Sequence, residues 1–397
     1  MSKLKLTTLA TMLIAAIVLA QAPVQKTEVI KQAIDNPTIG INAFNGPKEA
    51  REKLESMLAL SGWFNVLPEN QAGKAQILLQ AAAGNTQYAI NLQAPGHKLE
   101  LKSTGQDLDQ AARDIVDQIL AKLFNVQAFC TTKIAYVQPG RNDEKEICSI
   151  FIDNTGFERL TKNVAISTEP NWGHAGALVY TLAKNNALHI ILMDIKNKRQ
   201  RIISSARGLN SSAALSRNGQ YVALSMSFDN QVDLYAIDLA TNNRIRMTRD
   251  KAVESSPCWS PDGSRVCFVS DMPGIPKLYV VSLKGEKPKR LPIGGGECVS
   301  PDWSHVSNKI CYAQKASNGQ YVIGVIDMGD PNATPEIVTL AAGNWEAPSW
   351  APDGRHIVCT RETARAREIT VVDTWLRTFK AITGKGQFSL PAWQPAR

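Results

Sequence analysis

The chain has 397 residues, of which 44% are hydrophobic and 20% are charged, and its formal net charge at pH 7 is +8. These proportions are ordinary for a soluble globular protein and exclude a disordered chain, and the length suits two domains or one large domain with an added module. The basic balance predicts at most a modest preference for an acidic partner, because no run of lysine and arginine predicts nucleic-acid binding.

Residues 1–22 have the features of an export signal. Two lysines precede an apolar run that is too short to span a bilayer, and small residues follow at Ala20 and Ala22. Cleavage is expected after Ala20 or Ala22, and Ala20 is favoured because Pro23 directly follows the other site. No later stretch is long and apolar enough for a membrane helix, so we expect an exported, soluble mature protein.

Residues 23–128 contain no repeat and are predicted to form a small N-terminal α/β domain. A helix is predicted over residues 48–60, where apolar residues recur at the helical period, and a clearer one over residues 107–124. Short apolar segments predict strands near residues 38–44, 77–80, 88–92 and 99–101. About 100 residues are enough for a separate core, and residues 125–132 would connect this domain to the rest.

Residues 129–397 are built from a repeat, of which residues 253–283 are the clearest copy. A strand ends at Trp259, a tight turn follows at Asp262-Gly263, and an apolar second strand, a third strand and a charged fourth strand complete the unit. The positions equivalent to Trp259 are Trp172, Leu215, Trp303, Trp350 and Trp393, and successive positions are 43, 44, 44, 47 and 43 residues apart. Four-stranded propeller blades recur every ~40–45 residues, so the fold is predicted to be mostly β, with a C-terminal β-propeller. The tryptophans are interpreted as packing residues of the blades.

The two ends of the repeat complement each other. The second-type strand at residues 133–137 has no tryptophan-ending strand before it, and the tryptophan-ending strand at residues 391–393 has no second strand after it. We therefore expect the C-terminal segment to lie beside residues 133–137 and to close a six-bladed ring. Closure protects strand edges that an open array would expose.

The search for chemical motifs assigns no catalytic residue, no metal ligand and no cofactor. The sequence has no nucleophile elbow, zinc-protease motif, P-loop or dinucleotide fingerprint, and its five histidines do not cluster. Seven cysteines are an odd number for an exported protein, and most are interpreted as small buried strand residues. A disulfide between Cys130 and Cys148 is left open.

Three parts of the sequence carry a resemblance to a known family. The segment Ser256–Gly263, followed by Phe268–Asp271, resembles the WD40-like repeat of the TolB family. The ending Lys385–Pro395 and the propeller entry Thr132–Val137 are similar to the corresponding segments of that family. The order of export signal, small α/β domain and six-bladed propeller matches as well.

The resemblance implies a periplasmic, non-enzymatic component of the Tol-Pal envelope system, which supports outer-membrane integrity and cell division. It implies that the propeller mouth binds Pal, the peptidoglycan-associated lipoprotein, and that an N-terminal segment, residues 21–36 here, contacts TolA. The family's Pal-contacting positions lie just before the tryptophan-ending strands of two neighbouring blades. They correspond here to Leu209, Asn210, Ser211 and Ser212 in one blade and to Glu254, Ser255 and Ser256 in the next. Leu209 stands where the family has a histidine.

The alternative hypothesis is an enzyme, either a propeller-type hydrolase or the gating propeller of a serine peptidase. Such an enzyme needs a domain that carries the nucleophile, and residues 23–128 contain no nucleophile elbow. Labelling by a serine-reactive phosphonate would favour the enzyme. Enrichment of a peptidoglycan-binding lipoprotein from solubilised envelopes would favour the binding protein.

Overall fold

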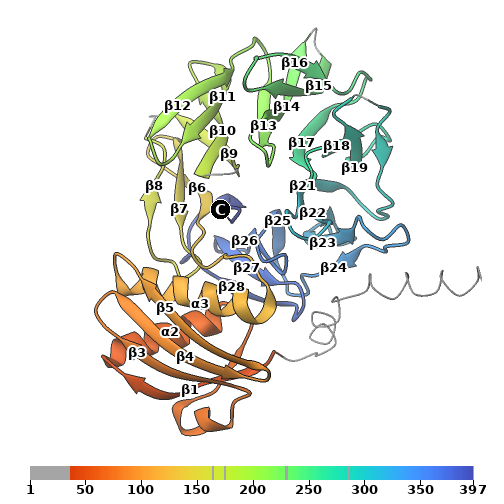
Figure 1. The fold of residues 1–397 in the computed structure, drawn as a ribbon. Coiled ribbons are helices and arrows are strands. Elements are labelled where there is room, and N and C mark those ends of the chain that lie inside the picture. The colour runs from red at the N-terminus through yellow and green to blue at the C-terminus, as the bar shows by residue number, and fades with distance from the viewer. Residues whose placement is uncertain (1–35, 163–164, 174–175, 229–230, 285, 397) are drawn as a thin grey trace, which may run out of the picture.

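The structure is a computed structural model that describes residues 36–162, 165–173, 176–228, 231–284 and 286–396. It consists of a small α/β domain followed by a six-bladed β-propeller (Figure 1). The predicted export signal, its cleavage sites and residues 21–35 of the proposed TolA segment lie outside the described residues.

The N-terminal domain is a five-stranded sheet with its helices on one face. The strand order is β2-β1-β3-β4-β5; β1 is parallel to β2 and β3, and the other pairs are antiparallel. Residues alternate between buried and exposed along β4, as expected when one face of a sheet packs on helices and the other faces solvent. The elements are β1 (Thr38–Asn45), α2 (Lys48–Leu60), β2 (Asn65–Val66), the 3₁₀-helix η1 (Glu69–Lys74), β3 (Ile77–Ala83), β4 (Gln87–Ala94), β5 (His97–Thr104) and α3 (Leu108–Phe124).

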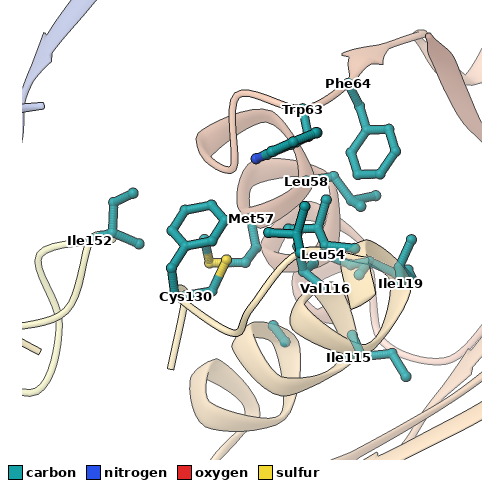
Figure 2. Close-up of a cluster of buried hydrophobic side chains, with 14 of the residues drawn as sticks. Leu54, Met57, Leu58, Trp63, Phe64, Ile115, Val116, Ile119, Cys130 and Ile152 are labelled. Carbon is teal, nitrogen blue, oxygen red and sulfur yellow. The ribbon is translucent and has the colours of Figure 1, made fainter. Parts of the chain in front are cut away.

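Both predicted helices are present, and the ends of α3 have local causes. The Asp107 side chain accepts a hydrogen bond from the Gln110 backbone N–H at 2.7 Å, which satisfies one of the free donors of the first turn. Asn125 ends the helix in the left-handed conformation, with φ of 56°. The buried stripe of α3 packs with Leu54 and Met57 of α2 (Figure 2).

The propeller has six four-stranded blades. Blade 1 combines β29 (Ser389–Trp393) with β6 (Ile134–Pro139), β7 (Lys145–Ile150) and β8 (Glu158–Arg159). A single bridge between Lys145 and Ile166 joins blade 1 to blade 2. Blade 2 is β9 (Ile166–Trp172), β10 (Ala177–Lys184), β11 (Ala187–Asp194) and β12 (Arg199–Ser204); blade 3 is β13 (Asn210–Leu215), β14 (Tyr221–Phe228), β15 (Gln231–Asp238) and β16 (Arg244–Arg246). Blade 4 is β17 (Glu254–Trp259), β18 (Arg265–Ser270), β19 (Lys277–Ser282) and β20 (Lys289–Arg290); blade 5 is β21 (Cys298–Trp303), β22 (Lys309–Lys315), β23 (Tyr321–Asp327) and β24 (Glu336–Ile337); blade 6 is β25 (Asn344–Trp350), β26 (His356–Glu362), β27 (Arg367–Asp373) and β28 (Thr378–Ala381).

The C-terminal strand pairs with the start of the propeller, as the two ends of the repeat predicted. Strand β29 runs antiparallel to β6, with Ala392 opposite Ala135 and Trp393 opposite Ile134. The Trp393 indole N–H donates to Thr132 Oγ1 at 2.9 Å, and this contact fixes the last strand to the entry of the propeller. Each of the six inner strands ends at the predicted tryptophan or leucine, and all six of these side chains are at most 5% exposed. Their interpretation as packing residues is therefore confirmed.

The two domains share one hydrophobic core. The cluster around α2 and α3 continues through Phe129 and Cys130 to Ile152 of blade 1 and Val358 of blade 6. Cys130 lies beside Met57 in this cluster (Figure 2). Cys130 and Cys148 are both buried free thiols, as are the other five cysteines, so the open possibility of a disulfide between them is not realised in this structure.

The N-terminal domain contacts the propeller at blades 1 and 6. Trp63 Nε1 donates to Asp353 Oδ2 at 3.1 Å, in the turn that follows the inner strand of blade 6. Arg113 of α3 forms an ion pair with Asp153, after β7 of blade 1, at 2.7 Å. We call the end at which the inner strands finish the rear face, and the end at which they begin the mouth face. Both of these contacts lie on the rear face, opposite the end of the propeller that carries the predicted binding residues.

Candidate functional site

The mouth face leads into a central channel whose wall is a six-fold repeat of one backbone feature. Every inner strand has a β-bulge, and the first residue of each bulge is a non-glycine residue in the left-handed region. In five blades a proline follows directly. The bulge residues are Glu169, Ser212, Ser256, Ser300, Ala347 and Leu390, with φ between 49° and 54°. They line a channel of about 200 Å³ together with the two residues that follow each of them, except in blade 3, where only Ala213 joins Ser212.

Hydrogen bonds between neighbouring blades hold this channel wall in place. In three blades the residue before the tryptophan or leucine position accepts a hydrogen bond from the next blade's backbone. Asn171 accepts from the Leu215 N–H at 3.1 Å, and Asp302 accepts from the Trp350 N–H at 2.7 Å. Ser349 Oγ accepts from the Trp393 N–H at 3.0 Å. Burial of Asp302 away from water raises the pKa of its carboxyl to about 6, although the hydrogen bond from the Trp350 N–H favours the charged form.

The structure brings the two predicted groups of binding residues together on blades 3 and 4. Residues 210–212 open β13 and residues 254–256 open β17, and these two inner strands are neighbours around the channel. They belong to the strands themselves and not to the loops before them, which corrects the expectation from the sequence. Leu209 alone lies in the preceding loop, where its N–H donates to Ser227 Oγ at 2.7 Å.

Two of the predicted residues are fully buried and support the mouth from within. Asn210 accepts a hydrogen bond from Ser204 Oγ at 2.6 Å and donates to the Ala206 carbonyl at 2.7 Å. Glu254 accepts from Thr248 Oγ1 at 3.2 Å. The prediction that these two side chains contact a partner is therefore wrong, because neither side chain is exposed to solvent.

The charge of Glu254 also differs from what its residue type suggests. Its burial, together with the nearby carboxylates of Asp250 and Asp233, raises the pKa of Glu254 to about 8. At pH 7 this side chain is therefore mostly neutral. The mouth of blade 4 presents hydroxyls and backbone groups to solvent, without an acidic side chain at this position.

The remaining predicted residues are accessible. Leu209, Ser211, Ser212, Ser255 and Ser256 are all half-buried. Ser212 is already engaged, because its N–H and hydroxyl both donate to the carboxylate of Glu169, at 2.7 and 3.0 Å. The hydroxyls of Ser211 and Ser255 make no hydrogen bond to any other described residue, so both are available to a partner.

Sequence reasoning missed an apolar patch beside these serines. Val253, Met272 and Ile275 are 48%, 46% and 43% exposed and lie at the mouth end of blade 4. The Val253 N–H donates to Asp271 Oδ1 at 2.8 Å, which fixes the loop before β17 to the loop after β18. The proline-rich loop Asp271–Pro276 could have indicated this patch in the sequence, because its apolar residues lie between two strands and not within them.

A second, larger hollow lies on the rear face, where the N-terminal domain meets blades 5 and 6. This groove has a volume of about 940 Å³, and its lining includes Trp63, Phe124, Trp375 and Val306. Asn36, the first described residue, is at its edge, where its side-chain amide donates to the Gly62 carbonyl at 2.6 Å.

The described residues offer little for other chemistry. Among them there is no group of three or more histidine, cysteine or acidic side chains that could hold a metal ion. No helix within the described ranges is long and apolar enough to cross a membrane.

Comparison with known proteins identifies the propeller. The family model described as "TolB beta propeller domain" matches residues 120–397. The Tol-Pal system protein TolB of Francisella tularensis subsp. tularensis (strain WY96-3418) is 30% identical over 148 residues, a match that covers 34% of each chain. The match thus spans about a third of this curated relative.

Two solved structures show the same fold. The crystal structure of TolB from Acinetobacter baumannii superposes with a TM-score of 0.81 at 21% identity and covers 91% of this chain and 97% of its own. A putative TolB from Agrobacterium tumefaciens has a TM-score of 0.51 at 16% identity and covers 64% of this chain and 91% of its own.

Proposed function

This chain belongs to the TolB family of Tol-Pal system proteins, and from that premise we propose that it is a periplasmic, non-enzymatic protein that binds a partner at the mouth face. The partner is the peptidoglycan-associated lipoprotein Pal, and the complex supports outer-membrane integrity and cell division. Residues 1–22 are the export signal, residues 23–128 the N-terminal domain and residues 129–397 the propeller.

One observation carries the proposal: the mouth face has unsatisfied polar groups next to exposed apolar side chains. Ser211 and Ser255 have hydroxyls without a partner among the described residues, and the patch of Val253, Met272 and Ile275 lies beside them. Apolar surface surrounded by hydrogen-bonding groups is typical of protein interfaces. The contacts of Trp63 with Asp353 and of Arg113 with Asp153 lie at the other end of the propeller, which leaves this face accessible.

The N-terminal segment, residues 21–36, is proposed to contact TolA. Its last residue, Asn36, lies at the edge of the rear groove and accepts a hydrogen bond from Arg355 Nη2 at 3.1 Å. The described end of the segment therefore lies at the junction of the two domains, on the rear face. Pal and TolA would then bind at opposite ends of the molecule.

The test of the mouth is a pair of matched substitutions. Ser255→Arg places a long cation between blades 3 and 4, and we expect it to weaken binding of the purified lipoprotein's peptidoglycan-binding domain by at least tenfold, because interface energy concentrates at a few central residues. Gln220→Arg makes the same change in charge at an exposed position on the rear face and should leave affinity unchanged. Isothermal titration calorimetry measures both. Equal effects of the two variants, or no binding by the unmodified protein, would contradict the proposal.

A further inference from the structure

The outer edges of blades 2, 3 and 4 carry most of the basic excess of the protein. Three segments, residues 195–204, 239–251 and 283–291, contain the outermost strand of each of these blades and the loops next to it. Together they hold twelve lysines and arginines against two acidic residues, whereas the whole chain has a net charge of only +8. We call these three segments the basic perimeter. Strands β12 and β16 lie at the outside of the ring (Figure 1).

The cations of the basic perimeter are exposed and largely free. Eleven of the twelve are exposed. The exception, Arg246, is half-buried and pairs with the buried Asp233; no other ion pair involves the perimeter within the described part of the chain. Arg199, Arg244 and Lys289 lie one on each outer strand, are exposed and form no ion pair with a described residue, although Asp194 lies opposite Arg199 in the sheet.

Protection of exposed strand edges does not account for this pattern. Charged residues on an edge strand, lysine above all, prevent pairing with other chains, but every blade has such an edge, so this need does not single out three blades. The corresponding segment of blade 5, residues 328–337, has two acidic residues and no lysine or arginine. The corresponding segment of blade 1, residues 151–162, has two acidic and two basic residues. Concentration of cations on three consecutive blades calls for a different cause, and attraction of a polyanion is the simplest.

From this placement we propose that the basic perimeter binds an anionic glycan strand, a linear polymer whose attached short peptides carry carboxylates. Successive blades of a six-bladed ring turn by about 60°, so the outer edges of blades 2 to 4 point in three different directions. A flat lipid surface cannot touch all three edges at once, whereas a flexible strand can follow the curve. The choice of a glycan rests on the proposed periplasmic location, where the peptidoglycan layer supplies such strands. Binding there leaves both the mouth face and the rear groove open.

The test is co-sedimentation of the purified protein with peptidoglycan sacculi that have been boiled in detergent to remove all lipoprotein. We expect the protein to pellet with sacculi at about 50 mM NaCl and to be released at about 300 mM, because the screening length falls from roughly 14 to 6 Å. The triple variant Arg199→Gln, Arg244→Gln, Lys289→Gln should bind roughly tenfold more weakly, because each exposed ion pair contributes a few-fold in affinity.

The matched control is Arg365→Gln, Lys380→Gln, Lys385→Gln, which removes three exposed cations from blade 6. It lowers net charge by the same amount and should retain the affinity of the unmodified protein. Equal loss in both triple variants would show a non-specific charge effect and overturn the proposal. So would failure of the unmodified protein to pellet, or equally strong sedimentation with phosphatidylglycerol vesicles. Ser255→Arg should pellet normally, because stripped sacculi contain no lipoprotein. Loss of lipoprotein binding at the mouth face therefore does not change this measurement, and the two proposals are tested independently.

Discussion

At the scale of single residues, the most unusual group is a histidine buried between two carboxylates at the domain junction. The His356 ring places Nδ1 at 2.6 Å from Asp353 Oδ2 and Nε2 at 3.5 Å from Asp373 Oδ2. Arg355, also buried, pairs with Asp373, and Trp63 of the N-terminal domain donates to Asp353. Two cations and two anions thus balance in a largely buried site at the edge of the rear groove.

This pairing determines the protonation of His356. Burial by itself would lower the pKa of the imidazole, but the carboxylates of Asp353 and Asp373 outweigh burial and raise it to about 9. The histidine is therefore charged at pH 7. A folded-state pKa above the unfolded value means that the stabilisation is complete below the unfolded pKa of about 6.5 and is lost as the pH rises through 9.

We predict that the free energy of unfolding falls between pH 7 and pH 10 by an amount on the order of 3 kcal/mol that depends on His356. Urea unfolding at a series of pH values measures it. His356→Gln should be less stable than the unmodified protein at pH 7 and should lose this part of the pH dependence. His97→Gln, at the turn between β4 and β5, is the control and should keep the full profile. A parallel decline in the two variants would refute the role assigned to His356.

Sequence reasoning found no cluster of histidines and gave no hint of the network around His356. Its partners are Asp353 in a turn, Asp373 at the end of another strand and, through Asp353, Trp63 in the other domain. Only the folded chain brings them together. Likewise, Asn210 and Glu254 were expected at the mouth because they match the family's Pal-contacting positions, and only the structure shows their burial.

At the scale of elements, the repeat predicted most of the architecture because its signals are local. Turn residues such as Asp262-Gly263 recur at a fixed distance after each inner strand, and Gly263 has the positive φ of 70° that this turn requires. The bulge at each inner strand was not predicted. Its first residue is Glu, Ser, Ala or Leu, none of which is a usual choice for the left-handed region, and five of the six precede a proline.

Strand β29 gives the clearest prediction at this scale. Deletion of residues 388–397 removes the inner strand of blade 1 and leaves β6 with an unpaired edge, so we expect loss of cooperative unfolding and aggregation. A surface tail of that length would usually be dispensable. Deletion of residues 395–397 alone keeps Trp393 and its bond to Thr132 and should leave the melting temperature within a few degrees of the full chain. Circular dichroism melting measures both, and a normal transition in the longer deletion would contradict the closure of the ring by β29.

At the scale of the whole molecule, the shared core explains how two domains act as one scaffold. Residues of α2 and α3, the connection at Phe129 and strands of blades 1 and 6 belong to one buried cluster. The small domain is fixed to the rear face by this core and by the network around His356. The sequence predicted each domain but not this docking, since the contacting residues lie hundreds of positions apart and follow no local pattern.

The same arrangement places the three proposed binding surfaces at different parts of the molecule. The mouth face offers Ser211, Ser255 and the apolar patch of blade 4, the rear groove lies beside the start of the described chain, and the basic perimeter lies between the two faces. Three distinct surfaces allow a glycan and two protein partners to bind without overlap. Of these surfaces, the mouth carries the central claim.

The most direct measurement is site-specific photocrosslinking in intact cells. A benzophenone side chain at position 255 should form an adduct with a peptidoglycan-binding lipoprotein, identified by mass spectrometry, and the same probe at position 220 on the rear face should not. Adducts from position 220 alone, or from neither position in cells that contain the lipoprotein, would contradict binding at the mouth.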